Sequence, residues 1–453
     1  MNIRIAITVF ITVAVPLHLF SQGLFESSLT GDSPSSAQGQ SNAVDLSGHV
    51  KGGIYGMENS SDDPVIASAM SQPALKFTAK KTDLGKAYAE TRIRAQSNEG
   101  IGCVDLDIRE AWIAMYPGRC EIRLGKQIVA WGRADGINPT NNITPMNILA
   151  FSSDFDDMRL GNFLARCRLN LPHVGIEGIW IPLFAADEIA VDETMLPAGI
   201  QLDRPDYPDN RLENSSCALR VDLTFPVIDG SLSYFNGYET QPGFNYELKP
   251  NGVSLIPRAY RIHAAGADFS TAIKSFGLRG EVCAEFPYKD YDEYVYIPNP
   301  SLQAVAGIDR SIGNRTFLLQ YSGRYTFYYD NVNNPVLSNP SDPMARQLYA
   351  MALTETEVNR LNRLFSGTTD KYRQTVTALT EATLLYETLH LKLAGMYDIT
   401  TEEYTINPTL SYDITDAFTV TAGGRYFGGP EESLNDLASE ILSMVYTELQ
   451  LSF

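Results

Sequence analysis

The stretch that decides the fold is the last one of the chain, Met444-Val445-Tyr446-Thr447-Glu448-Leu449-Gln450-Leu451-Ser452-Phe453. Side chains of a β-strand point alternately to its two faces. Here the odd-numbered positions, from Val445 to Phe453, are apolar apart from one threonine, whereas Glu448, Gln450 and Ser452 occupy even-numbered positions. The stretch therefore predicts a strand with one apolar and one polar face.

The same alternation recurs upstream, from Val44 onward. It is clear over residues 317–327 and again over residues 389–398. These runs reach ten or more residues, whereas a strand of a globular sheet usually has about five or six. Lipid cannot satisfy an open sheet edge, so long strands with one apolar face are typical of a closed sheet in a bilayer. We expect an all-β fold, a transmembrane antiparallel up-and-down β-barrel.

The connections support this prediction, because long and short segments alternate along the chain. Eight short turns are expected, and the other side carries nine connections, of which 98–102 and 400–402 are also short. This arrangement gives eighteen strands, or sixteen if the pieces of 301–329 merge. Short periplasmic turns and longer outer loops are typical of bacterial outer-membrane barrels. The expected long loops are 58–72, 132–157, 185–213, 240–258, 287–299, 330–371 and 429–440.

Composition excludes two other classes of protein. The 453 residues are 44% hydrophobic with a mean hydropathy of −0.14, too low for a bundle of membrane-spanning helices. Lys and Arg number 35 against 54 Asp and Glu, for a net charge of −19. Such a chain is poorly suited to bind nucleic acid through its phosphates, so no nucleic-acid partner is expected.

The N-terminus has the pattern of an export signal. Arg4 precedes an apolar run that ends near Ser21, so we expect a signal peptide over residues 1–21. Residues 22–43 are rich in Ser, Gln, Gly and Asn and predict a flexible tail, too short for a plug domain. The barrel is expected over residues 44–453, with both termini periplasmic.

Phe453, the final residue, lies on the apolar face of its strand. It resembles the terminal signal of outer-membrane barrels that the barrel assembly machinery reads. The resemblance implies the cell outer membrane as the location, with its lipid as a partner. The alternative fold is a soluble secreted β-sandwich.

No catalytic or metal-binding signature is recognisable, so an enzyme, a metal site or a cofactor is not expected. The histidines outside the signal peptide lack the spacing of metal ligands. The five cysteines are scattered and predict small apolar residues, although a Cys120–Cys167 disulfide between neighbouring strands stays open.

Charged residues on the polar faces of neighbouring strands form the first candidate site. Opposite charges in such a ladder would be costly against lipid and are expected to face the lumen. They either pair across strands to stiffen the wall or act as a polarised pore lining that filters ions. The residues of this charged ladder are Glu90, Arg92, Arg94, Asp105, Asp107, Arg109, Glu121, Arg123, Gln127, Arg166 and Arg168.

The most distinctive sequence is the hairpin over residues 104–145. It contains Arg109-Glu110-Ala111-Trp112, then Gly125-Lys126-Gln127, Trp131-Gly132 and Asn138-Pro139. It resembles a family of largely uncharacterised bacterial outer-membrane barrel proteins with a Gly-Lys/Arg-Gln, Trp-Gly and Asn-Pro hairpin. The resemblance implies a porin-like barrel that passes solutes or lipids, and it transfers no catalytic residue.

Within this hairpin, Trp131 is expected to end a strand at the outer membrane interface. Gly132 is expected to allow a sharp turn, and Asn138-Pro139 an extended step. Loop 132–157 is the third outer loop, which in general porins folds inward. In that arrangement its acids would face the arginines of the third to sixth strands across a constriction; otherwise the loop stays outside, with solvated acids. These acids are Asp135, Asp154, Asp156 and Asp157.

A helix is expected in the loop 330–371. Apolar residues at helical spacing run from Met344 to Phe365, and Thr354 with Glu357 matches a capping box. The helix either packs on the barrel rim or covers the mouth as a lid. Acidic residues in the loop 185–213 predict a negative vestibule that enriches cations.

The function expected from these features is passive diffusion of small, hydrophilic solutes through an outer-membrane channel. One alternative is a conduit for hydrophobic compounds or lipids, and another is a surface receptor or adhesin with a closed lumen. Whether the chain forms a homo-oligomer stays open.

Overall fold

The computed structural model describes residues 43–453 except 59–63, 82–83, 99–100, 135, 148–151, 189–198, 251, 432, 434, 437–438 and 440–442. The expected signal peptide, and all but one residue of the expected tail, lie outside the described residues.

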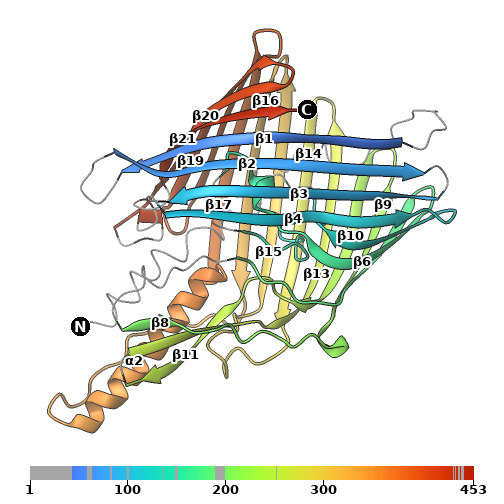
Figure 1. Ribbon diagram of the computed structural model, residues 1–453. Coiled ribbons are helices and arrows are strands. Elements are labelled where there is room, and N and C mark those ends of the chain that lie inside the picture. The colour runs from blue at the N-terminus through green and yellow to red at the C-terminus, as the bar shows by residue number, and fades with distance from the viewer. Residues whose placement is uncertain are drawn as a thin grey trace.

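The described residues form a closed antiparallel barrel of eighteen strands (Figure 1). Each strand pairs with the next barrel strand along the chain, and β1 also pairs with β21, which closes the sheet. The eighteen-strand prediction is confirmed. The barrel strands are β1 (Ala43–Glu58), β2 (Pro64–Lys81), β3 (Gly85–Asn98), β4 (Ile101–Met115), β5 (Cys120–Gln127), β6 (Asn162–Asn170), β7 (Val174–Ile181), β9 (Ser216–Thr224), β10 (Ile228–Tyr238), β13 (Arg261–Ile273), β14 (Phe276–Pro287), β15 (Ser301–Ile312), β16 (Arg315–Thr326), β17 (Tyr372–Leu384), β18 (Leu389–Asp398), β19 (Tyr404–Thr415), β20 (Phe418–Gly428) and β21 (Met444–Ser452).

The alternation of the sequence determines which side chains face outward. In β21 the odd-numbered residues Val445, Leu449 and Leu451 are exposed on the outer surface, whereas Met444 and Glu448 are buried on the inner side. Because paired residues of neighbouring strands share a face, this assignment extends around the ring. The wall is therefore apolar outside and polar inside.

The closing seam between β1 and β21 ends at the last residue. Phe453 and Gly48 exchange two backbone hydrogen bonds, each 2.9 Å long. The Phe453 ring is exposed on the apolar outer face, as its position in the alternation predicts.

One detail of the connections differs from expectation, and one alternative is excluded. The first outer loop is shorter than residues 58–72, because β2 begins at Pro64 and pairs with β1 as far as Glu58 through a register shift at Tyr55/Gly56. The merger that would have left sixteen strands does not occur, because β15 and β16 are separate strands across Gly313 and Asn314.

The long loops, at the end of the barrel opposite the short turns, carry a small subdomain. A three-stranded sheet of β8 (Ile200–Leu202), β11 (Gly243–Lys249) and β12 (Gly252–Arg258) packs against helix α2 (Pro343–Phe365), and both lie beyond one end of the barrel (Figure 1). Their shared core contains Phe244, Leu255, Val358, Leu361 and Phe365.

The helix is confirmed, but its capping box is wrong. Asp342 is the N-cap, and its side chain accepts a hydrogen bond from the Met344 backbone N–H at 2.9 Å. Thr354 lies inside the helix and donates to the Ala350 carbonyl. No helix in the described part of the chain is both long and apolar enough to cross a membrane. All five cysteines are free thiols, so the Cys120–Cys167 alternative is not observed.

Candidate functional site

The connection between β5 and β6, residues 128–161, is called the inward loop. One end of it contacts β13 and β14: Arg133 Nε donates to Asp268 Oδ1 at 2.7 Å, and the Ala134 backbone N–H donates to Glu281. Further on, Gln320 of β16 donates to the Ile137 carbonyl at 3.3 Å. The loop thus lies against polar side chains of strands far from its own hairpin.

The other end of the inward loop reaches the seam strands. Lys51 Nζ of β1 lies 2.7 Å from Asp157 Oδ2, and Arg92 of β3 lies 2.8 Å from Asp157 Oδ1. The Ser153 backbone N–H donates to Glu448 of β21 at 2.9 Å. Since these strands and β13, β14 and β16 belong to different parts of the ring, the loop crosses the lumen.

Among the described acids of the inward loop, Asp157 alone binds two basic side chains of the barrel wall. Its side chain and those of Lys51 and Arg92 are each at most 7% exposed. Burial favours the neutral acid, but Lys51 and Arg92 hold the pKa of the Asp157 carboxyl well below its usual range. The carboxylate is therefore ionised at any physiological pH.

The other acids of the inward loop have different surroundings. Asp154 caps the short helix η2 (Phe155–Met158) by accepting from the Asp156 N–H at 3.0 Å. The Asp156 carboxylate lies 3.2 Å from Arg159, and its backbone carbonyl accepts from Arg109. Asp135 lies outside the described residues.

The charged ladder is largely paired within the wall. Glu90 accepts from Arg92 and Tyr88 at 2.8 and 2.9 Å, and Arg109 lies 3.5 Å away. Lys126 lies 3.3 Å from Asp107. These contacts agree with the view that cross-strand pairs stiffen the wall, whereas a filtering role stays a prediction.

Three arginines that were expected to face the loop acids pair elsewhere. Arg123 pairs with Glu121 on its own strand at 2.7 Å, and its guanidinium lies 4.1 Å from the centre of the Trp112 ring. Arg166 and Arg168 both bind Glu177 of β7. That expectation is therefore wrong for these residues, because acids on the wall are closer in register than the loop.

The remaining three ladder residues form no ion pair with any described residue. Arg94 donates to Gln72 at 2.9 Å. Asp105 is exposed near the N-terminal end of β4. Gln127 is buried, and its amide donates to the Leu164 carbonyl at 3.1 Å.

Trp131 does not lie at the membrane interface, which corrects the expectation from sequence. β5 ends at Gln127, and the Trp131 ring is 3% exposed within the barrel. Its indole N–H donates to Glu177 at 2.9 Å. A buried indole needs such an acceptor, and a carboxylate on the inner wall supplies it.

The Gly132 and Asn138-Pro139 motifs shape the start of the inward loop. Gly132 has φ +101°, and a Cβ there would collide with the Asn138 side chain. Asn138 donates to the Trp131 carbonyl at 2.5 Å. Instead of an extended step, Asn138 and Pro139 begin a turn closed by the Asn141 N–H at 3.3 Å, since proline suits the second position of a turn.

Residues that the sequence did not single out extend the ladder around the wall. Arg220 lies 2.8 Å from Asp222 and 3.2 Å from Asp268, which also binds Arg133. The alternation of the sequence could have indicated these three residues, because they occupy inward positions of β9 and β13. Further members of this kind are Lys51, Glu177, Arg279, Glu281, Asp309, Arg373, Asp398 and Glu448.

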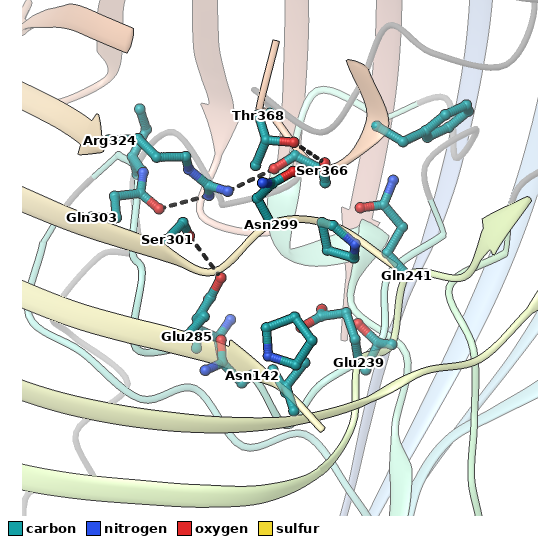
Figure 2. Close-up of a pocket in the computed structure, with 18 of the residues that line it drawn as sticks. Asn142, Glu239, Gln241, Glu285, Asn299, Ser301, Gln303, Arg324, Ser366 and Thr368 are labelled. Atoms are coloured by element: carbon teal, nitrogen blue, oxygen red, sulfur yellow. Dashed lines mark hydrogen bonds between the residues drawn. The ribbon is translucent and has the colours of Figure 1, made fainter. Parts of the chain in front are cut away.

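A polar cavity, called the outer pocket, lies between the inward loop, the barrel wall and the segment after α2 (Figure 2). Arg324 donates to the Gln303 side chain at 2.8 Å and to the Ser366 carbonyl at 2.6 Å. Glu239 and Glu285 line the pocket with Arg324. The C-terminal end of α2 therefore covers part of the mouth, and the C-terminal half of the helix packs on the small sheet through Val358, Leu361 and Phe365.

Burial controls the protonation of two loop carboxyls beside this pocket. It raises the pKa of Asp187 to about 6. It also raises the pKa of Glu239 to about 8, with help from neighbouring Glu285 and Asp187. At neutral pH, Glu239 is therefore mainly uncharged.

A pH-dependent ion preference is the first prediction. Between pH 6 and pH 9 Glu239 loses its proton, so the reversal potential in a salt gradient should shift toward cations. Burial raises the pKa of Glu239 above its ordinary value of 4.5, so the neutral carboxyl favours the folded barrel. This contribution to the free energy of unfolding is complete below about pH 4.5 and is lost as the pH rises through about 8. Glu239→Gln should remove most of the shift above pH 7. A wild-type reversal potential that is equal at both pH values would contradict the assignment.

No protein-family model and no curated protein matches the sequence. Solved structures do match. Pseudomonas aeruginosa OccK2 (OpdF) in complex with glucuronate gives a TM-score of 0.53 at 8% identity, over 90% of this chain and 97% of that chain. Acinetobacter baumannii OccAB1 gives 0.51 at 8% identity, over 92% and 98%. Pseudomonas aeruginosa outer membrane protein OpdK gives 0.50 at 8% identity, over 91% and 98%. At this identity the similarity establishes the fold, that of outer-membrane barrels.

Proposed function

We propose that the chain is an outer-membrane channel through which small, hydrophilic solutes diffuse passively. The observation that carries this proposal is a lumen of alternating charges, crossed by a loop, inside a wall whose outer face is apolar. A passive channel needs only such a lining and no energy input. The similar fold of solved outer-membrane barrels supports the proposal.

The proposed permeation path runs past the inward loop. Its narrowest part is assigned to Asp157, Asp156 and Asp154 on one side and to the charged ladder on the other. The path continues through the outer pocket. Because both basic and acidic groups line it, we propose polar or charged solutes rather than hydrophobic ones as cargo.

Several further assignments belong to the same proposal. Residues 1–21 direct export, the short turns and both termini face the periplasm, and Phe453 is the signal for the assembly machinery. We also propose that the hairpin 104–145 relates the chain to barrel proteins with the same motif; the buried Trp131 and the turn at Gly132 support a structural role for that motif.

The test uses the purified full chain in planar bilayers and in liposomes. Glucuronate is the first solute, because OccK2 was solved in complex with it; glucose serves as the uncharged solute of similar size. We expect stable conductance and liposome swelling in at least one of the two. Silence in both assays would disprove the channel. If neither conductance nor swelling is seen and lipid co-purifies with the chain, a hydrophobic conduit would be favoured. If neither is seen and no lipid co-purifies, a surface receptor or adhesin would be favoured.

A further inference from the structure

Two arginines interrupt an otherwise uncharged region of the outer wall. Paired residues share a face, so the registers of β14 to β20 define the outward set. Within these described strands, Arg310 and Arg315 are the only charged members of that set. Both are exposed, and both lie beside the short turn at Gly313 and Asn314.

Neither guanidinium has a carboxylate or hydrogen-bond partner among the described residues. Arg310 lies over the Phe276 ring, 4.7 Å from its centre. The nearby acids Asp309 and Glu381 face inward and pair with Arg279 and Lys392. Two uncompensated positive charges therefore stand at the edge of the lipid-facing surface, where a phosphate group is the natural bidentate partner.

A groove in the wall begins at one of these arginines. Its volume is about 650 Å³, and Arg315 forms one end. Apart from Arg315 and Thr380, its outward lining is apolar, and small residues such as Ala382 and Ala422 lie beside larger ones. The larger residues of the lining include Phe317, Leu391, Leu393 and Leu410.

The groove rises away from the short turns. Through successive registers Arg315 pairs with Ala382, then Leu391, Leu410 and Ala422. Arg315 is the first residue of β16, whereas Ala422 is the fifth of β20. The row therefore leads from the membrane boundary into the apolar part of the wall.

We propose that this surface binds one anionic glycerophospholipid of the leaflet on the short-turn side, with its phosphodiester between Arg310 and Arg315 and one acyl chain in the groove. Two guanidinium groups exceed the charge of one phosphodiester, so a headgroup without an ammonium fits better than a zwitterionic one. The site lies on the outside of the barrel, so its occupancy does not depend on the proposed function.

The experiment is native mass spectrometry of the delipidated full chain, titrated with phosphatidylglycerol or with phosphatidylcholine of the same acyl chains. The wild type should bind phosphatidylglycerol more tightly. The double variant Arg310→Gln/Arg315→Gln should weaken that binding about tenfold and lose the preference. The matched control is Lys80→Gln/Lys81→Gln. It removes two exposed charges from the end of β2, which lies on the same short-turn side of the barrel as Arg310 and Arg315, and it should behave as wild type.

A second variant tests the groove without changing charge. Ala382→Leu/Ala422→Leu should fill the groove and weaken phosphatidylglycerol binding, while heat-modifiable migration on a gel confirms folding and bilayer conductance stays unchanged. Equal binding of the two lipids to wild type would overturn the proposal, as would full binding by either double variant. A dimer that the groove-filling variant dissociates would assign the groove to a second copy instead.

Discussion

Replacing Asp157 with alanine is expected to increase single-channel conductance and shift ion preference toward anions. The substitution leaves Lys51 and Arg92, both at most 6% exposed, without their shared carboxylate. Breaking a buried ion pair in this way costs about 3 kcal/mol. The tip of the inward loop should therefore leave the wall, widen the bore and expose two positive charges.

The matched control for this variant is Asp105→Ala. It removes one negative charge from the inner face of β4, where Asp105 is exposed and does not anchor the loop. Its conductance should stay close to wild type. If Asp157→Ala and Asp105→Ala give equal conductance in planar bilayers, the loop does not limit the bore.

Replacing Glu177 with alanine is expected to destabilise the folded barrel by about 3 kcal/mol. Glu177 is 1% exposed and accepts from Trp131 at 2.9 Å, from Arg166 at 2.7 Å and from Arg168 at 3.3 Å. The variant leaves an indole N–H and two guanidinium groups without this acceptor. The midpoint temperature of heat-modifiable migration should fall, and tryptophan emission should shift to longer wavelength.

Glu121→Ala is the comparison for Glu177→Ala. Glu121 is also an inner-wall acid, but it binds one arginine, Arg123, and its side chain is 22% exposed. Its removal should lower the midpoint much less. Equal losses in the two variants would show that Glu177 has no special role in holding the loop.

The strand count could be predicted from sequence because alternation and connection length are local properties. A period of two places Val445 and Leu449 outward whatever the rest of the chain does. The start of β2 was harder to predict from sequence, because residues 64–66 extend the strand by pairing with β1, beyond the reach of β3. Tertiary pairing decided that boundary.

The candidate site was less predictable, since its contacts join distant parts of the chain. Lys51 and Asp157 are 106 residues apart, and Ser153 and Glu448 are 295 apart. Sequence could indicate that Arg166 faces the lumen, but not that Glu177 lies closer than the loop acids. Trp131 was misplaced for the same reason, because an aromatic at a strand end suits either lipid or a buried acceptor.

The tip of the inward loop contacts both strands of the seam, Lys51 on β1 and Glu448 on β21. These two binding positions come together only after the last strand of the chain has joined the first. During biogenesis, the loop is therefore synthesised early but acquires its final place late. If β1 and β21 joined in the wrong register, Lys51 and Glu448 would be displaced from each other. The loop could then not bind both strands, so it would take its final position only in a correctly closed barrel.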